Sequence, residues 1–156
     1  MDLSKKDIEI LKLLQKDARM STAAIAETVN LSQSPCWRRI AGYEESGLIK
    51  RKVHILDREK LGMDLVVFAT IKLISSKGKA LDEFEKSVRD VPEIAECYTM
   101  TGIFDYMLKI IAKDIRHYEN FLRSYLLQLP NIDEVNSHIA VTQIKNTTEL
   151  PLDTQL

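Results

Sequence analysis

Residues 21–47, STAAIAETVNLSQSPCWRRIAGYEESG, decide the fold of the N-terminal part of this 156-residue chain. Small and apolar residues at helical spacing follow Ser21, a residue type that often caps the start of a helix. After a tight turn, a second helix begins with Ser32 or Ser34 as its cap. Pro35 then falls in the first turn, where the missing N–H of proline is not needed. The stretch therefore predicts two short helices joined by a turn.

The second of these helices carries polar side chains at its N-terminus. A helix that enters the major groove of DNA meets base edges and phosphates with the residues of its first turns. Free N–H groups at the helix start add an anion site for a phosphate, and basic residues nearby position the protein on the backbone. We therefore expect the following DNA-binding residues: Ser21, Thr22, Ser32, Gln33, Ser34, Pro35, Trp37, Arg38, Arg39, Lys50 and Arg51.

Several of these residues have a second interpretation. Arg38 and Arg39 also fit a solvated helix face. Trp37 also fits a core residue, because tryptophan at helical spacing usually packs, and Tyr43 is expected to pack against the preceding helices. Cys36 fits either a redox sensor or, more often for such a position, a buried and unreactive thiol.

The flanking sequence extends this unit and then changes character. Upstream, Ser4 and Asp7 supply a cap and a first-turn acid for an amphipathic helix. Downstream, residues 48–56 are basic and β-prone, and residues 57–62 form a linker. The N-terminal part is thus three helices followed by an extended segment.

The C-terminal half alternates strands and helices. β-Branched and aromatic residues predict a strand at 65–74, and two further strands surround Gly102. Apolar residues at helical spacing predict a helix that ends at Pro92 and a longer one that ends at Pro130. A last strand is expected over residues 132–144. The order strand–helix–strand–strand–helix–strand is that of a ferredoxin-like sandwich, so the fold class is α+β.

Composition and charge place limits on function. The apolar content of 45% and charged content of 29% are typical of globular proteins. No apolar run approaches the roughly 20 residues of a membrane span, and the charged N-terminus lacks the apolar stretch of a secretory signal. Cys36 and Cys97 lie outside any C-x-x-C spacing. We expect no metal site, no membrane contact and a reducing cytoplasmic location.

The two halves of the chain differ in charge. Residues 1–60 hold 12 Lys and Arg against 9 Asp and Glu, a net of +3, whereas residues 61–156 hold 10 against 14, a net of −4. This asymmetry fits one basic half that works on an anionic partner and a second half with another task. Ordinary scatter of charge is the alternative.

A set of landmarks resembles the Lrp/AsnC family of feast/famine regulators, in order and over essentially the whole chain. The resemblance implies a winged helix-turn-helix, a hinge strand and a ferredoxin-like effector domain, through which dimers form that often assemble into octamers. Gly42 and Tyr43 depart from the family, which often has a charged helix former and a leucine there. The landmarks are LSKKDI at 3–8, LSQSPCWRRI at 31–40, GLI at 47–49, LDREKLG at 56–62, TGIFDY at 101–106 and LPL at 150–152.

The loop at Gly102 is the candidate effector site. Glycine allows close backbone approach, so N–H groups there would bind the carboxylate of an amino acid, and Asp105 would accept its ammonium group. The alternative is that Gly102 only turns a hairpin and Asp105 caps its exit. The resemblance points to the same loop, completed by residues from a neighbouring dimer. The expected effector-binding residues are Met100, Thr101, Gly102, Ile103, Asp105 and Tyr106.

These observations predict a sequence-specific DNA-binding transcriptional regulator that responds to a small molecule, an amino acid, and needs no cofactor. The expected domains are a winged helix-turn-helix at 1–50, a hinge strand and linker at 51–63, and a ligand-sensing and oligomerisation domain at 64–156. Ligand binding would shift the spacing of paired DNA-binding domains away from one helical turn of about 34–36 Å.

Two other classes of protein stay open at this point. A ferredoxin-like enzyme is one, since the fold alone excludes nothing. However, His54, His117 and His138 are scattered, and the sequence contains no H-E-x-x-H, Walker loop or nucleophile elbow. An architectural DNA-binding protein is the other, and it would differ in its indifference to amino acids.

Overall fold

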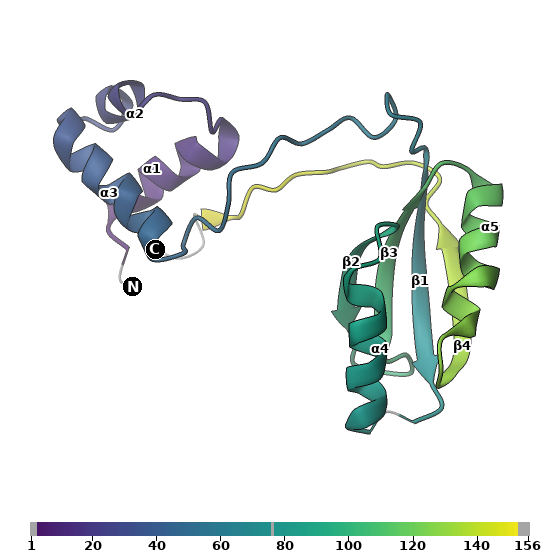
Figure 1. Ribbon diagram of the computed structural model, residues 1–156. Coiled ribbons are helices and arrows are strands. Elements are labelled where there is room, and N and C mark those ends of the chain that lie inside the picture. Colours follow the sequence, from purple (N-terminus) through teal and green to yellow (C-terminus); the bar gives the residue numbers. More distant parts are fainter. Residues whose placement is uncertain (1–2, 76, 153–156) are drawn as a thin grey trace. The chain divides into compact units, whose positions relative to one another are not determined.

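The computed structural model describes residues 3–75 and 77–152, which fold into two compact units (Figure 1). The first unit runs to Ile55 and also contains the chain from Lys145 onward. The second unit spans Leu56–Ile144. The C-terminal end of the ligand-sensing domain predicted at 64–156 therefore groups with the first unit.

A reciprocal pair of hydrogen bonds explains this grouping. The side-chain amide of Gln15 donates to the carbonyl of Leu150 at 3.1 Å, and its side-chain oxygen accepts from the N–H of Leu150 at 2.9 Å. The side-chain amide of Gln15 has an N–H donor and an oxygen acceptor placed like those of a backbone peptide group. It therefore bonds the returning segment in the way that a neighbouring strand would. The first helix thus anchors the C-terminal segment.

Three helices make up the rest of the first unit, namely α1 (Lys5–Lys16), α2 (Thr22–Thr28) and α3 (Gln33–Glu45). Serine side chains begin the first two helices, because Ser4 accepts from the N–H of Asp7 and Ser21 accepts from the N–H of Ala24. The predicted three helices are confirmed. Their apolar faces enclose a small core of Ile10, Ile25, Ala26, Val29, Cys36 and Tyr43.

The second unit is a four-stranded sheet with two helices on one face (Figure 1). Its strands pair antiparallel in the order β2-β3-β1-β4, which confirms the ferredoxin-like prediction. In chain order its elements are β1 (Leu65–Leu73), α4 (Lys79–Arg89), β2 (Ile94–Thr99), β3 (Tyr106–Ala112), α5 (Ile115–Ser124), the short 3-10 helix η1 (Leu126–Gln128) and β4 (Ile132–Ile139).

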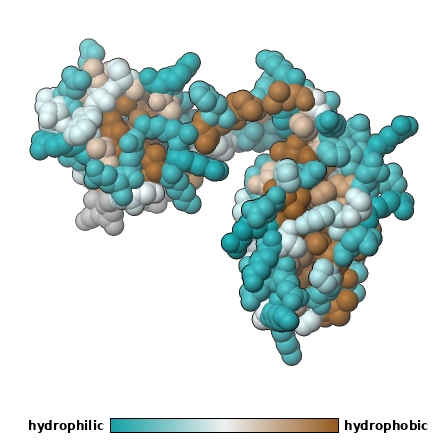
Figure 2. Space-filling model, in the orientation of Figure 1, coloured by the Kyte–Doolittle hydropathy of each residue, from teal (hydrophilic) through white to brown (hydrophobic). Residues whose placement is uncertain are grey.

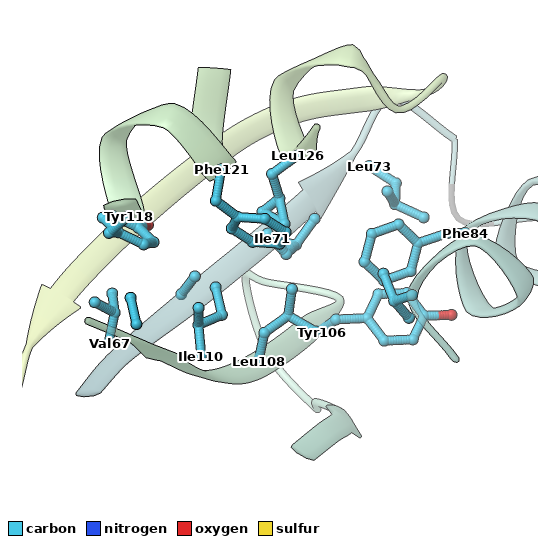
Figure 3. Close-up of a cluster of buried hydrophobic side chains, with 13 residues drawn as sticks. Val67, Ile71, Leu73, Phe84, Tyr106, Leu108, Ile110, Tyr118, Phe121 and Leu126 are labelled. Carbon is cyan, nitrogen blue, oxygen red and sulfur yellow. The ribbon is translucent and has the colours of Figure 1, made fainter. Parts of the chain in front are cut away.

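Figure 3 shows the core between this sheet and its helices. Alternate residues of β1 and β3, such as Ile71 and Leu108, point to the helix side, where Phe121 and Phe84 cover them. The ring centroids of Phe84 and Tyr106 lie 4.5 Å apart. Because the side-chain period of a strand is two, the residues between these face the uncovered side of the sheet.

Three expectations need correction. The helix expected to run to Pro130 ends at Ser124 and gives way to η1, and the last strand ends at Ile139 rather than 144. In the part of the chain that the structure describes, no strand lies between Glu45 and Leu65, so the hinge strand expected within 51–63 is not formed. A strand needs a neighbour to satisfy its backbone groups, and a single chain supplies none for this segment.

None of the described helices is long and apolar enough to cross a membrane. Among the same residues, no group of three or more His, Cys, Asp or Glu side chains is arranged to hold a metal ion.

Candidate nucleic-acid interface and ligand loop

The start of α3 presents its polar groups to solvent. Ser32 is the N-cap, yet its hydroxyl makes no capping hydrogen bond, whereas the hydroxyl of Ser21 is occupied in capping α2. Gln33 and Ser34 follow and are both exposed. The first N–H groups of a helix have no partner within it. The N-terminus of α3 therefore offers hydroxyl, amide and backbone donors at one exposed surface.

Trp37 and Arg38 extend this surface by one helical turn. They lie four residues after Gln33 and Ser34, so the four side chains are neighbours on one side of α3. The side chain of Trp37 is 60% exposed, which excludes the interpretation of Trp37 as a core residue of this chain. Arg38 is exposed as well, and no ion pair joins it to another described residue. We call Ser32, Gln33, Ser34, Trp37 and Arg38 the α3 surface.

Arg39 has a different environment from its neighbour. Its Nη1 atom lies 2.6 Å from Oδ1 of Asp7 in α1, and the hydroxyl of Tyr43 donates to the same oxygen. The other oxygen of Asp7 accepts from the N–H of Ser4 at 2.8 Å. Sequence reasoning placed Arg39 on DNA phosphate, but in this chain its guanidinium pairs with the carboxylate that links α1 to α3.

This network shifts the pKa values of its members. Burial raises the pKa of Asp7, but the hydrogen bonds from Ser4, Tyr43 and Arg39 outweigh burial and hold that pKa well below its usual value. Burial and the neighbouring Asp7 carboxylate both raise the pKa of Tyr43. Asp7 is therefore ionised and Tyr43 neutral at physiological pH, which is the pairing that the hydrogen bonds require.

The other predicted DNA-binding residues lie around the α3 surface. Lys50 and Arg51 are exposed in the segment that follows α3, Thr22 is half-buried at the start of α2, and Pro35 is half-buried on α3. Cys36 is fully buried, and burial raises the pKa of its thiol, as expected for an unreactive cysteine.

The loop Met100–Asp105 is fastened to the end of β1. The N–H of Asp105 donates to the carbonyl of Ile71 at 2.9 Å, and Oδ2 of Asp105 accepts from the N–H of Leu73 at 2.8 Å. Lys72 donates to the carbonyl of Ile103 at 2.7 Å. The interpretation of Asp105 as a structural cap therefore holds for at least one of its oxygens.

The remaining loop residues divide by exposure. Thr101 and Gly102 are exposed, Gly102 has a φ of +119° that suits glycine, and the side chain of Ile103 is 74% exposed. Tyr106 is a correction to the predicted set, because it is 1% exposed, packs on Phe84 and donates its hydroxyl to Glu85 at 2.9 Å. Its side chain belongs to the core rather than to the loop surface.

A helix-turn-helix unit joined to a ferredoxin-like unit is an architecture typical of ligand-responsive transcriptional regulators, and comparison with known proteins agrees. Residues 3–50 match the model of winged helix-turn-helix DNA-binding domains, and residues 66–150 match that of the Lrp/AsnC ligand binding domain. The chain belongs to the Lrp/AsnC family of transcriptional regulators, and it is not an enzyme.

Curated relatives match over nearly their full length. The DNA-binding transcriptional activator DecR of Escherichia coli is 36% identical over 97% of this chain and 99% of its own. The transcriptional regulator AzlB of Bacillus subtilis is 37% identical over 97% of this chain and 96% of its own.

Solved structures agree with the fold over the whole chain. A transcriptional regulator of Neisseria meningitidis in complex with L-methionine superposes with a TM-score of 0.94 at 32% identity, covering 99% of this chain and 100% of its own. An AsnC family regulator of Agrobacterium tumefaciens superposes with a TM-score of 0.93 at 40% identity and the same coverage.

The Asp7 network generates a pH-dependent stability prediction. The pKa of Asp7 in the folded protein lies below its value of about 3.9 in the unfolded chain. The contribution of the Asp7 carboxylate to the free energy of unfolding is therefore complete above about pH 5, and it is lost as the pH falls through 4 and below. Asp7→Asn should lower the free energy of unfolding by about 2–3 kcal/mol at pH 7. In urea titrations the deficit should shrink with acidification. Asp17→Asn, at an exposed ion pair, is the control and should change stability little. A deficit independent of pH would contradict the assignment.

Proposed function

We propose that the α3 surface enters the major groove of duplex DNA, and that an amino acid bound to the second unit alters this binding. The observation that carries the DNA half is the exposed N-terminus of α3, where the Ser32 hydroxyl and the side chains of Gln33, Ser34 and Arg38 face solvent. Buried or paired side chains there would have no access to bases.

The α3 surface suggests a division of roles. Gln33 and Arg38 have the donor geometry that reads purine edges, and Trp37 offers an apolar face to a thymine methyl group or a sugar. The Ser32 hydroxyl and the first N–H groups of α3 suit a phosphate. Lys50 and Arg51 suit backbone contacts that carry no sequence information. Arg39 acts by fixing α3 against α1.

Arg38→Ala tests sequence reading. Against a duplex selected by the wild-type protein from random sequence, we expect a loss of about 1–3 kcal/mol, with a smaller loss on unselected duplex. Lys50→Ala should weaken both about equally and reduce the salt dependence. Fluorescence anisotropy of labelled duplexes measures both affinities. Equal losses on both duplexes for Arg38→Ala would assign Arg38 to phosphate instead.

The amino-acid half of the proposal rests on the loop and on relatives. Thr101, Gly102 and Ile103 present exposed backbone and side chains beside Met100. Apart from its chain neighbours, no described residue comes within 4 Å of the Cβ position of Gly102, which leaves room for a carboxylate to approach its backbone. The structurally similar Neisseria meningitidis protein carries L-methionine. A Klebsiella pneumoniae relative, 32% identical over 99% of this chain and 94% of its own, is a leucine-responsive regulatory protein. We therefore propose an apolar amino acid as the effector.

A panel of the twenty amino acids in a thermal-shift assay tests this proposal. A specific effector at about 100 times its dissociation constant stabilises the protein by about 2.7 kcal/mol. Gly102→Ala should abolish the shift, because the added Cβ strains the loop backbone. Gly62→Ala is the matched control, since Gly62 also has positive φ and open space around its Cβ position. If no amino acid at millimolar concentration shifts the melting temperature, an architectural DNA-binding protein becomes the better description.

The uncovered face of the sheet supports self-association. Strand register places Phe68 and Thr70 of β1 on this face, beside Met107 of β3 and Tyr98 of β2. Phe68 is 37% and Tyr98 55% exposed. The buried hydroxyl of Thr70 lacks a hydrogen-bond partner in the described chain. We propose that two copies pack these faces together as a homodimer, and that dimers assemble further to an octamer.

The first of the two segments that join the units fits the same proposal. Val53, Ile55 and Leu56 are exposed although they are large and apolar, and Figure 2 shows brown atoms at the surface where the two joining segments run. A second copy would supply the neighbouring strand that this β-prone segment lacks in one chain.

Phe68→Glu should dissociate the assembly, because it places a charge in the proposed apolar interface. Sedimentation velocity would show a monomer for this variant, with an unchanged circular dichroism spectrum. Ile115→Glu is the control: Ile115 is more exposed than Phe68 but lies at the start of α5, on the helix side of the sheet. A Phe68→Glu variant that sediments like the wild type would refute this interface.

A further inference from the structure

A groove of about 400 Å³ lies between α4 and the edge strand β2, and sequence reasoning did not find it. Small-molecule pockets usually measure roughly 300–1,000 Å³, so the groove suits a small ligand. The residues that matter for the argument are Glu85, Val88 and Arg89 of α4, Ile94 and Cys97 of β2, and Tyr106 of β3.

The groove has one charge of each sign on the same side of α4. Glu85 and Arg89 are four residues apart, which places their Cβ atoms about 5–6 Å from each other. They do not form an ion pair in the described chain; instead Glu85 accepts from the hydroxyl of Tyr106 at 2.9 Å. The hydroxyl of the core residue Tyr106 thereby positions the Glu85 carboxylate. The Arg89 guanidinium has no ion-pair partner among the described residues.

The other acidic side chain at the groove does not compete for Arg89. Glu96 is paired with Lys109 at 2.7 Å and accepts from the hydroxyl of Tyr98 at 2.6 Å. Between the charges the floor includes apolar groups, because Ile94 is half-buried there, with Val88 and the ring of Tyr106 buried beneath it. The groove thus combines an anionic group, a cationic group and an apolar contact at Ile94.

We propose that this groove binds a free apolar α-amino acid. Arg89 would bind its carboxylate, Glu85 its ammonium group, and Val88 and Ile94 its side chain. Both charged contacts are charge-assisted hydrogen bonds, which are the strong kind. The inference rests on the proposed amino-acid sensing and adds a site distinct from the loop Met100–Asp105.

Occupancy of the groove would act on that loop from both ends. Thr99 and Tyr106 line the groove, and they are the residues immediately before and after the loop. A ligand in contact with both would therefore bias the loop's conformation. This gives the groove a coupling to the effector loop without a direct contact between ligand and loop.

Cys97 provides a direct reporter of occupancy. It lines the groove and is exposed, whereas Cys36, the other cysteine, is fully buried. Partial desolvation against the groove and the nearby Glu85 carboxylate both raise the pKa of the Cys97 thiol, so the alkylation is best followed at mildly alkaline pH. Iodoacetamide will then label Cys97 in the folded protein and Cys36 only on unfolding.

The experiment measures the rate of Cys97 alkylation in the full-length protein, with and without millimolar L-methionine or L-leucine. We expect either or both to slow the reaction in a saturable way. Arg89→Met should raise the concentration needed for protection by roughly 10- to 100-fold. Arg116→Met, a charge removal at an exposed position on α5, should leave protection unchanged.

The outcomes separate this site from the proposed function. Amino acids that shift the melting temperature but leave Cys97 alkylation unchanged would overturn the groove site and keep the sensing proposal. Protection that survives Arg89→Met would also overturn it. Saturable protection lost in Arg89→Met, without any effect on DNA affinity, would support the groove site and overturn the sensing proposal instead.

Discussion

The DNA-binding unit depends on one buried carboxylate, that of Asp7. It accepts hydrogen bonds from the backbone N–H of Ser4 at the start of α1 and from the side chains of Arg39 and Tyr43 in α3. The carboxylate therefore joins the first helix to the third. Because Arg39 and Tyr43 face α1, the opposite side of α3 is directed to solvent. The Asp7 network, together with the packing of Cys36 and Ile40 in the core, therefore orients α3 so that Gln33, Trp37 and Arg38 are exposed. The network adds to the small apolar core of this unit, to which α3 contributes Cys36 and Tyr43.

In the second unit, the end of β1 is where three parts of the chain meet. Asp105 caps the N–H of Leu73, and Asn131, which has a φ of +68°, accepts from the N–H of Ile74 and pairs its side-chain amide with Ser75. The loop Met100–Asp105 and the start of β4 thus share one anchor. From β4 the chain returns to the amide of Gln15.

The order of the elements could be predicted because periodicity and Gly or Pro boundaries are local properties of the sequence. The side-chain partners could not. Arg39 and Arg38 are adjacent in sequence, and the position of Asp7, 32 residues before Arg39, gives Arg39 an ion pair that Arg38 lacks among the described residues. Tyr106 ends the loop motif, but strand pairing turns its ring into the core. Glu85 and Arg89 look like an ordinary solvated helix face until β2 and Tyr106 close a groove beside them. In residues 48–56 the local sequence predicts a strand, but no strand forms because one chain supplies no neighbouring strand to pair with it.

The central claim is that the N-terminal turns of α3 meet DNA, and Trp37 allows the most direct test because it is the only tryptophan of the chain. Its indole is exposed beside Gln33 and Arg38, so its emission reports on that surface alone. Titration with duplex DNA at low salt should change the intensity and wavelength of this emission, in parallel with binding measured on labelled duplex. DNA that binds with full affinity and leaves the emission of Trp37 unaltered would contradict the claim.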